Sequence, residues 1–139
     1  NMPEIMVAHN LPYVATACHS YPIDFMNKVK KARSIKGPSY IHCLSVCPTG
    51  WRCRTRECIA MGRLAVQTGA FPLYEVEHGK YKLSSVMPET LRPLEDYIRL
   101  QGRFRHLTPD EIGMFQKRVK LEYNKLMNKM KHSRSWREM

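Results

Sequence analysis

The chain has 139 residues, of which 43% are hydrophobic and 25% are charged, so its composition is that of a globular protein and excludes a disordered one. Its formal net charge is +11, from 23 Lys and Arg against 12 Asp and Glu. Residues 5–23 form an uncharged run long enough to cross a bilayer, but His9, Pro12 and Pro22 interrupt it and exclude a membrane helix. Because no secretion signal is visible, we expect a cytoplasmic protein.

The first part of the chain predicts helices that alternate with strands. Residues 3–9 predict a short helix, residues 13–17 a buried strand, and residues 23–35 a second helix that ends before Gly37-Pro38. Residues 40–46 predict a second strand, in which apolar residues do not alternate strictly with polar ones. That pattern is typical of a strand covered on both faces, as in a parallel sheet.

A cysteine turn follows the second predicted strand. Cys47 ends the apolar run and precedes Pro48-Thr49-Gly50, so its sulfur is expected at the carboxyl end of the sheet, where open α/β sheets bind ligands. Gly50 permits backbone N–H groups to approach closely and to donate to a sulfur atom. Further along, Cys53 lies among the arginines of residues 52–56, so we expect its thiolate to be favoured.

The chain has five cysteines, an odd number that argues against a disulfide framework. Cys18 stands apart, whereas the other four fall within 16 residues: Cys43, Cys47, Cys53 and Cys58. Their spacing matches no zinc-finger pattern, so one ligand to a site completed elsewhere is favoured over a self-contained site. A small zinc or redox module built from these four residues remains an alternative, and burial without a role is common for any cysteine.

After the cysteine turn, Thr55 is expected to cap a helix that runs to Thr68, with Gly69 just past its end. Residues 71–77 predict a third strand, and His78-Gly79 predicts a hairpin turn into residues 81–83.

The sequence changes character from residue 85. Residues 94–100 predict one or two helical turns, and Thr108-Pro109-Asp110-Glu111 predicts a helix start with a capping box. The helix is expected to end at about Lys131, with one apolar stripe that packs on the domain body or on a partner. The stripe consists of Ile112, Phe115, Val119, Tyr123, Leu126 and Met130.

Positive charge is concentrated in this last helix. Residues 117–137 hold eight Lys and Arg against one acid, Glu122. The run is either a solvated helix face or a surface that attracts nucleic acid or an acidic protein. Because only Tyr123 and Trp136 interleave with the basic residues and no nucleic-acid motif is present, a basic nucleic-acid-binding domain is kept only as an alternative.

These elements predict an α/β fold with part of a parallel sheet in residues 1–85 and a C-terminal extension with a long helix in residues 86–139. Three strands bury little, and the chain starts with Asn1 rather than Met. We therefore expect the chain to be a portion of a larger subunit.

Several segments in series resemble the C-terminal half of the beta subunit of 2-oxoacid:ferredoxin oxidoreductases, and within that family the pyruvate synthases. The segments are NMPEIMVAHNLPYVATA (residues 1–17), GPSYIH (37–42), SVCPTGW (45–51), GRLAVQTG (62–69), PLYE (72–75) and QGRFRHL (101–107). The resemblance as a whole runs from about residue 1 to residue 131, nearly the whole chain. No single segment is specific, but the series is.

The resemblance implies part of a thiamine-diphosphate-binding α/β fold, in a multi-chain enzyme that decarboxylates a 2-oxo acid oxidatively. Coenzyme A accepts the acyl group, and iron–sulfur clusters pass the electrons to ferredoxin. It implies that Cys47 is one of four thiolates that hold a 4Fe-4S cluster. The other three, and most ligands of magnesium and thiamine diphosphate, are implied to lie upstream, so this chain alone is expected to be inactive. Cys18, Cys43, Cys53 and Cys58 match no family ligand.

Overall fold

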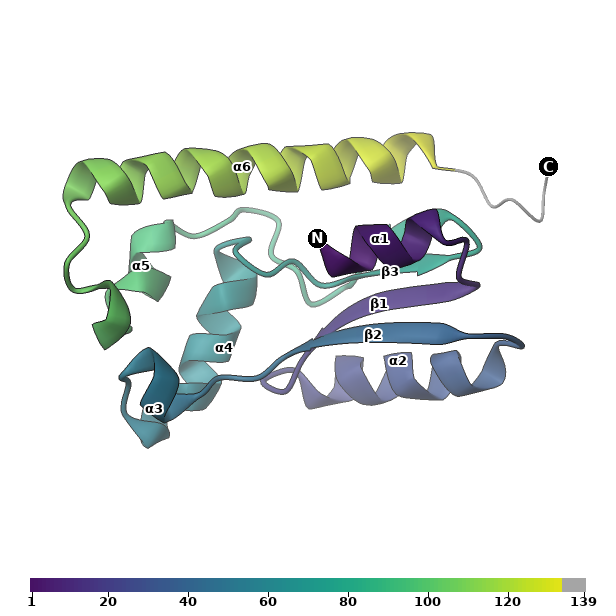
Figure 1. Cartoon of the computed structure of the whole chain (residues 1–139), viewed down its shortest axis with the longest axis horizontal. Coiled ribbons are helices and arrows are strands. Elements are labelled where there is room, and N and C mark those ends of the chain that lie inside the picture. Colours follow the sequence, from purple (N-terminus) through teal and green to yellow (C-terminus); the bar gives the residue numbers. More distant parts are fainter. Residues whose placement is uncertain (134–139) are drawn as a thin grey trace.

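A computed structural model describes residues 1–133, which form a four-stranded sheet with helices on both faces (Figure 1). The strands are β1 (Tyr13–Cys18), β2 (Ser39–Leu44), β3 (Tyr74–Glu77) and β4 (Lys80–Leu83), in the order β2-β1-β3-β4. The sheet is built around β1, because all six of its residues are buried. The predicted strands and their α/β setting are thus confirmed.

The sheet is mixed, not wholly parallel as predicted. β1 and β2 are parallel, with Tyr13 opposite Ser39 and Cys18 opposite Leu44, but β3 runs antiparallel to β1. The chain enters β3 beside the carboxyl end of β1, where the Thr16 hydroxyl donates to the Pro72 carbonyl oxygen at 2.8 Å. A strand that starts at that end must run back along its neighbour, so β3 is antiparallel. The hairpin turn at His78-Gly79 then adds β4 antiparallel to β3, as predicted.

Strand β2 is only partly covered, although helices on both faces of the sheet, α1 (Met2–Ala8) and α2 (Pro22–Ser34), contact it. It is an edge strand paired only with β1 among the strands of residues 1–133, and its six residues are exposed or half-buried. The lack of strict alternation between apolar and polar residues in this strand therefore reflects its position at the edge of the sheet rather than inside it.

The helices cover the two faces unequally. They are α1 (Met2–Ala8), α2 (Pro22–Ser34), α3 (Pro48–Trp51), α4 (Cys58–Gln67), α5 (Leu94–Ile98) and α6 (Pro109–His132), with single 3₁₀ turns η1 (Thr55–Glu57) and η2 (Gly102–Phe104). Figure 1 shows α2 on one face of the sheet, and α1 with α6 on the other. None of the helices described is both long and apolar enough to span a membrane.

Two predicted helix starts have different outcomes. The capping box of α6 is present: the Thr108 hydroxyl accepts from the Glu111 N–H at 3.3 Å, and the Glu111 carboxylate accepts from the Thr108 N–H at 2.7 Å. Thr55, in contrast, does not cap a helix. It begins the turn η1, closed by the Glu57 N–H on the Arg54 carbonyl, so α4 starts only at Cys58.

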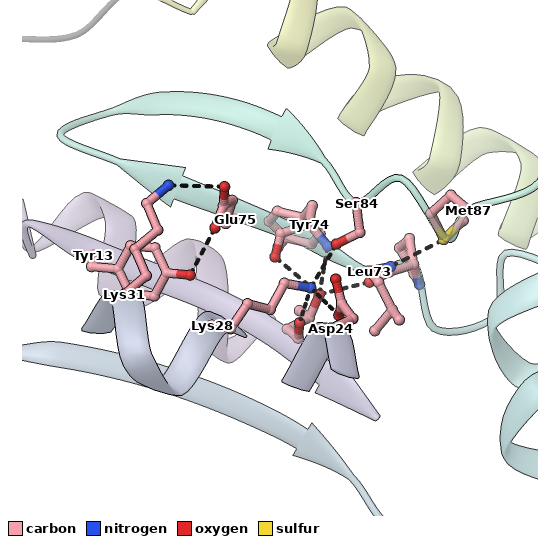
Figure 2. A network of polar contacts seen from close by, with 11 residues as sticks. Tyr13, Asp24, Lys28, Lys31, Leu73, Tyr74, Glu75, Ser84 and Met87 are labelled. Carbon is pink, nitrogen blue, oxygen red and sulfur yellow. Dashed lines mark hydrogen bonds and ion pairs between the residues drawn. The ribbon is translucent and has the colours of Figure 1, made fainter. Parts of the chain in front are cut away.

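Helix α2 turns a polar side to the sheet. Its apolar stripe faces away, with Ile23, Met26 and Val29 70%, 53% and 46% exposed, whereas Lys28 is only 4% exposed. The Lys28 ammonium donates to the Asp24 carboxylate at 2.7 Å and reaches the sheet through hydrogen bonds to the Thr16 carbonyl and the Ser84 hydroxyl (Figure 2). Burial lowers the pKa of Lys28, and the Asp24 carboxylate opposes that effect.

A second ion pair also fixes α2. The Lys31 ammonium lies 2.9 Å from the Glu75 carboxylate, which also accepts a 2.8 Å hydrogen bond from the Tyr13 hydroxyl (Figure 2). A half-buried ion pair with a further hydrogen bond stabilises more than an exposed one. Polar contacts thus hold α2 to the sheet.

Helix α6 packs on the body of the chain. Its Leu126 is buried in an apolar cluster with Val14 of β1 and with Tyr74 and Val76 of β3. Phe115, in contrast, is 49% exposed although it belongs to the predicted stripe. The stripe therefore contacts the sheet mainly through the C-terminal half of the helix.

Candidate functional site

The cysteine turn lies where the sequence predicts it, beyond the carboxyl end of β2. Cys47 has an extended backbone (φ −104°, ψ 105°) and caps the N-terminus of the short helix α3, where its sulfur accepts the Gly50 N–H at 3.3 Å. The preceding residue, Val46, is buried and anchors the turn in the core, while Cys47 itself is exposed. The fold thus presents a thiol at the surface on a fixed turn.

Gly50 leaves room for this contact. A Cβ atom placed on Gly50 would lie 3.3 Å from the Cys47 sulfur, closer than ordinary van der Waals contact, so a side chain at this position would require the sulfur to shift slightly. A backbone N–H that donates to sulfur stabilises a thiolate and tunes the potential of a metal centre bound to it. The donor chemistry of the turn therefore fits an iron–sulfur ligand.

The other end of α3 contacts a segment that is distant in the sequence. Arg52 ends the helix in a left-handed conformation (φ 53°), and its carbonyl oxygen accepts the Gly102 N–H at 3.2 Å. The Trp51 ring packs edge-on against Tyr97 of α5, with 6.2 Å between ring centroids. Residues 97–104 therefore support the cysteine turn, and sequence reasoning assigned them no such role.

The five cysteines do not form one site. Cys18 is buried and donates to the Gly62 carbonyl oxygen at 3.7 Å, and Cys43 is exposed on β2. Within residues 1–133, no group of three or more His, Cys, Asp or Glu side chains is placed to hold a metal ion. The structure therefore does not favour the alternative of a zinc module built from the four clustered cysteines.

The expected activation of Cys53 is wrong. Burial raises the pKa of its thiol, and the neighbouring Cys58 and Glu57 raise it further. The side chains of Arg52, Arg54 and Arg56 are exposed, so water screens their charge from Cys53.

The basic charge lies in two separate places. Figure 1 shows α3 apart from α6, and α6 bears six of the eight basic residues of the run at residues 117–137, three in each half of the helix. Residues 134–137 of that run, with Trp136, lie outside the part of the chain that the structure describes. The charge closest in sequence to Cys47 comes instead from three exposed arginines, Arg52, Arg54 and Arg56.

Comparison with known proteins confirms the resemblance. The chain is homologous, over most of its length, to subunits of 2-oxoacid:ferredoxin oxidoreductases. It is 50% identical over 119 residues to the pyruvate synthase subunit PorB of Methanocaldococcus jannaschii, covering 86% of this chain and 40% of that protein. It is 48% identical over 124 residues to the ketoisovalerate oxidoreductase subunit VorB of Pyrococcus abyssi, covering 88% of this chain and 40% of that protein. No protein-family model matches the chain.

The chain spans about 40% of the length of the curated relatives that it matches. The activities of those relatives are therefore activities of proteins that are longer than this chain.

Proposed function

We propose that this chain is a portion of the beta subunit of a 2-oxoacid:ferredoxin oxidoreductase of the pyruvate synthase type. The assembled enzyme decarboxylates a 2-oxo acid oxidatively, transfers the acyl group to coenzyme A and passes the electrons through iron–sulfur clusters to ferredoxin. The observation that carries the proposal is the 48–50% identity to pyruvate synthase and ketoisovalerate oxidoreductase subunits. Because the relatives are named as subunits, we propose that this portion acts within a multi-chain complex in the cytoplasm and not alone.

In this proposal Cys47 supplies one thiolate to a 4Fe-4S cluster. Its exposed sulfur has room for iron, and the Gly50 N–H stabilises negative charge on it. Pro48 at the first position of α3 fixes the backbone after the cysteine, so the sulfur is held in one place. The cluster supplies one-electron transfer when it is bound. The other three thiolates come from elsewhere in the assembled enzyme.

Thiamine diphosphate and magnesium are assigned on the family resemblance alone. We assign the mixed sheet to the thiamine-diphosphate-binding domain and α5 with α6 to its C-terminal extension.

The test of this function uses the full-length subunit assembled with its partner subunits. We expect reduction of ferredoxin that requires coenzyme A and one of two 2-oxo acids, pyruvate or 2-ketoisovalerate, the two suggested by the relatives' names. The measurement is the initial rate with each acid, with and without coenzyme A. A complex that contains iron yet reduces ferredoxin with neither acid, nor with any other 2-oxo acid, would contradict the proposal.

The proposal also predicts where ferredoxin docks. Ferredoxins are typically acidic, so a basic face near the cluster speeds their encounter. Arg54 and Arg56 are exposed on the turn that follows α3, whereas Lys117 and Lys120 are exposed on α6. Reversing the charge at Arg54 and Arg56 together (to Glu) should slow ferredoxin reduction about 10-fold at low salt, and the difference should shrink as ionic strength rises.

The matched control reverses Lys117 and Lys120 together, which changes the net charge by the same amount. We expect little change in rate. If only this second pair slows the reaction, the docking face lies on α6, and the assignment to the turn after α3 is wrong. Rates that do not respond to ionic strength in any variant would contradict electrostatic docking altogether.

A further inference from the structure

The segment at residues 101–104 reaches the cysteine turn through a buried amide. Gln101 is 1% exposed, and its side-chain N–H donates to the Tyr97 carbonyl oxygen at 3.0 Å. Its amide oxygen accepts the Arg103 Nε–H at 2.9 Å. Because the amide is fixed by burial and by its own hydrogen bond, it holds the Arg103 guanidinium in one orientation.

The guanidinium of Arg103 stacks on two aromatic rings. Its central carbon lies 4.4 Å from the centroid of the Trp51 ring and 4.6 Å from that of Phe104. Trp51 is the last residue of α3, and its N–H donates to the Cys47 carbonyl oxygen at 2.9 Å. A contact that fixes Trp51 therefore also fixes the helical turn that Cys47 begins.

The backbones of the two segments also touch. Besides the hydrogen bond from the Gly102 N–H to the Arg52 carbonyl oxygen, a Cβ on Gly102 would lie 2.7 Å from that oxygen and 2.9 Å from the Arg52 Cβ. Glycine is needed for this approach. The turn is thus held at its C-terminal end by the backbone of Gly102 and by the side chain of Arg103.

We propose that Arg103 is a positioning residue for the cluster that Cys47 ligates. Its guanidinium, oriented by Gln101 and stacked on Trp51, fixes α3 and so sets where the Cys47 sulfur is presented. It also places a permanent positive charge behind the turn, which favours the more negative, reduced state of a nearby cluster. This inference rests on the proposed function, because it assumes that Cys47 binds iron.

The contacts made at position 103 require an arginine and not merely a positively charged side chain. Only a planar guanidinium both stacks on the rings and donates along its edge to the Gln101 oxygen. Lysine at this position keeps the charge and loses the stacking, whereas methionine keeps apolar bulk and loses both the charge and the hydrogen bond. The two substitutions therefore separate charge from geometry.

The test compares Arg103→Lys and Arg103→Met in the assembled, full-length enzyme, with Arg99→Met as the control. Arg99 lies just before the same segment, but its side chain is 74% exposed and pairs only with Glu95 among the ion pairs of residues 1–133. The readouts are iron content, the electron paramagnetic resonance spectrum of the reduced clusters and their midpoint potentials. All three are independent of turnover.

We expect Arg103→Met to retain its iron and to shift one cluster potential to a more negative value, with a changed resonance line shape. Arg103→Lys should change the line shape but shift the potential less, and Arg99→Met should change neither. Loss of iron from both Arg103 variants of the assembled complex, with iron retained in Arg99→Met, would also support the positioning role. Wild-type potentials and spectra in Arg103→Met, or the same changes in Arg99→Met, would overturn it.

Failure of the proposed function has a different signature. If Cys47→Ala leaves the iron content unchanged, Cys47 is not a ligand, whatever the Arg103 variants do. If Cys47→Ala loses a cluster while the Arg103→Met spectra and potentials stay unchanged, the ligand assignment stands and the positioning role alone is wrong.

Discussion

Replacement of Cys47 by alanine is expected to reduce 2-oxo acid-dependent reduction of ferredoxin by more than about 100-fold, because outer-shell partners of metal sites alone are worth about 10- to 100-fold. The complex should still assemble. The Cys47 side chain is exposed, so its removal leaves no cavity in the core, and the backbone of the turn is held by Val46 and by the contact between Arg52 and Gly102. The measurement is the rate of ferredoxin reduction per assembled complex.

Cys43→Ala is the matched control for this prediction. Cys43 is also exposed and lies four residues earlier, on β2, where its sulfur donates to the Leu44 carbonyl oxygen at 3.8 Å. We expect its variant to keep the wild-type rate. A Cys47→Ala enzyme that remains fully active, or a Cys43→Ala enzyme that fails equally, would contradict the assignment of the ligand.

The second large effect is on stability and is expected from a substitution at Gly62, where α4 crosses the carboxyl end of β1. A Cβ atom on Gly62 would lie 2.1 Å from the Ser20 hydroxyl oxygen and 3.2 Å from the Cys18 sulfur. Both neighbours are buried, at 2% and 0% exposure, so neither side chain can swing away into solvent. Gly62→Ala should lower the free energy of unfolding by about 3 kcal/mol, at the upper end for overpacking. The measurement is the thermal unfolding midpoint of the full-length protein.

Gly113→Ala provides a control of opposite sign. Gly113 lies within α6 with nothing within 4 Å of the position of a Cβ, so alanine should stabilise the helix by about 0.5–1 kcal/mol. Ser20→Gly combined with Gly62→Ala should recover part of the loss, because it removes the atoms that clash. An unfolding midpoint for Gly62→Ala equal to that of the wild type would show that α4 does not pack on the Ser20 loop as described.

Features governed by local chemistry could be predicted from the sequence. The start of α6 follows from Thr108 and Glu111, three residues apart, and the hairpin from His78-Gly79, which adopts left-handed backbone angles (φ 48° and 86°). Each depends on atoms only a few residues apart, so the pattern alone determines the structure.

Features that depend on distant partners could not be predicted. The burial of Lys28 is decided by Thr16 on β1 and Ser84 after β4, and neither contact has a periodic signal in the sequence. The direction of β3 likewise depends on where the chain re-enters the sheet beside Thr16. The predicted division after residue 85 remains a prediction, although one apolar cluster joins Met61 of α4 with Leu94 and Ile98 of α5.

The site was predicted only in part, for the same reason. The turn around Cys47 and the role of Gly50 follow from adjacent residues, and the resemblance adds the ligand role. The pKa of Cys53 was predicted in the wrong direction because its arginine neighbours in sequence are exposed. The contact of Arg103 with Trp51 joins segments far apart in the chain. The sequence signal for it is Gly102, since a glycine permits close approach of another backbone segment.

The most direct test of the central claim is the iron and acid-labile sulfide content of the assembled enzyme carrying Cys47→Ala. If Cys47 ligates a 4Fe-4S cluster, this variant should contain about four fewer iron and four fewer sulfide atoms per beta subunit than the wild type or Cys43→Ala. Unchanged iron and sulfide, with an unchanged cluster spectrum, would show that Cys47 is not a ligand and that the cysteine turn has another role.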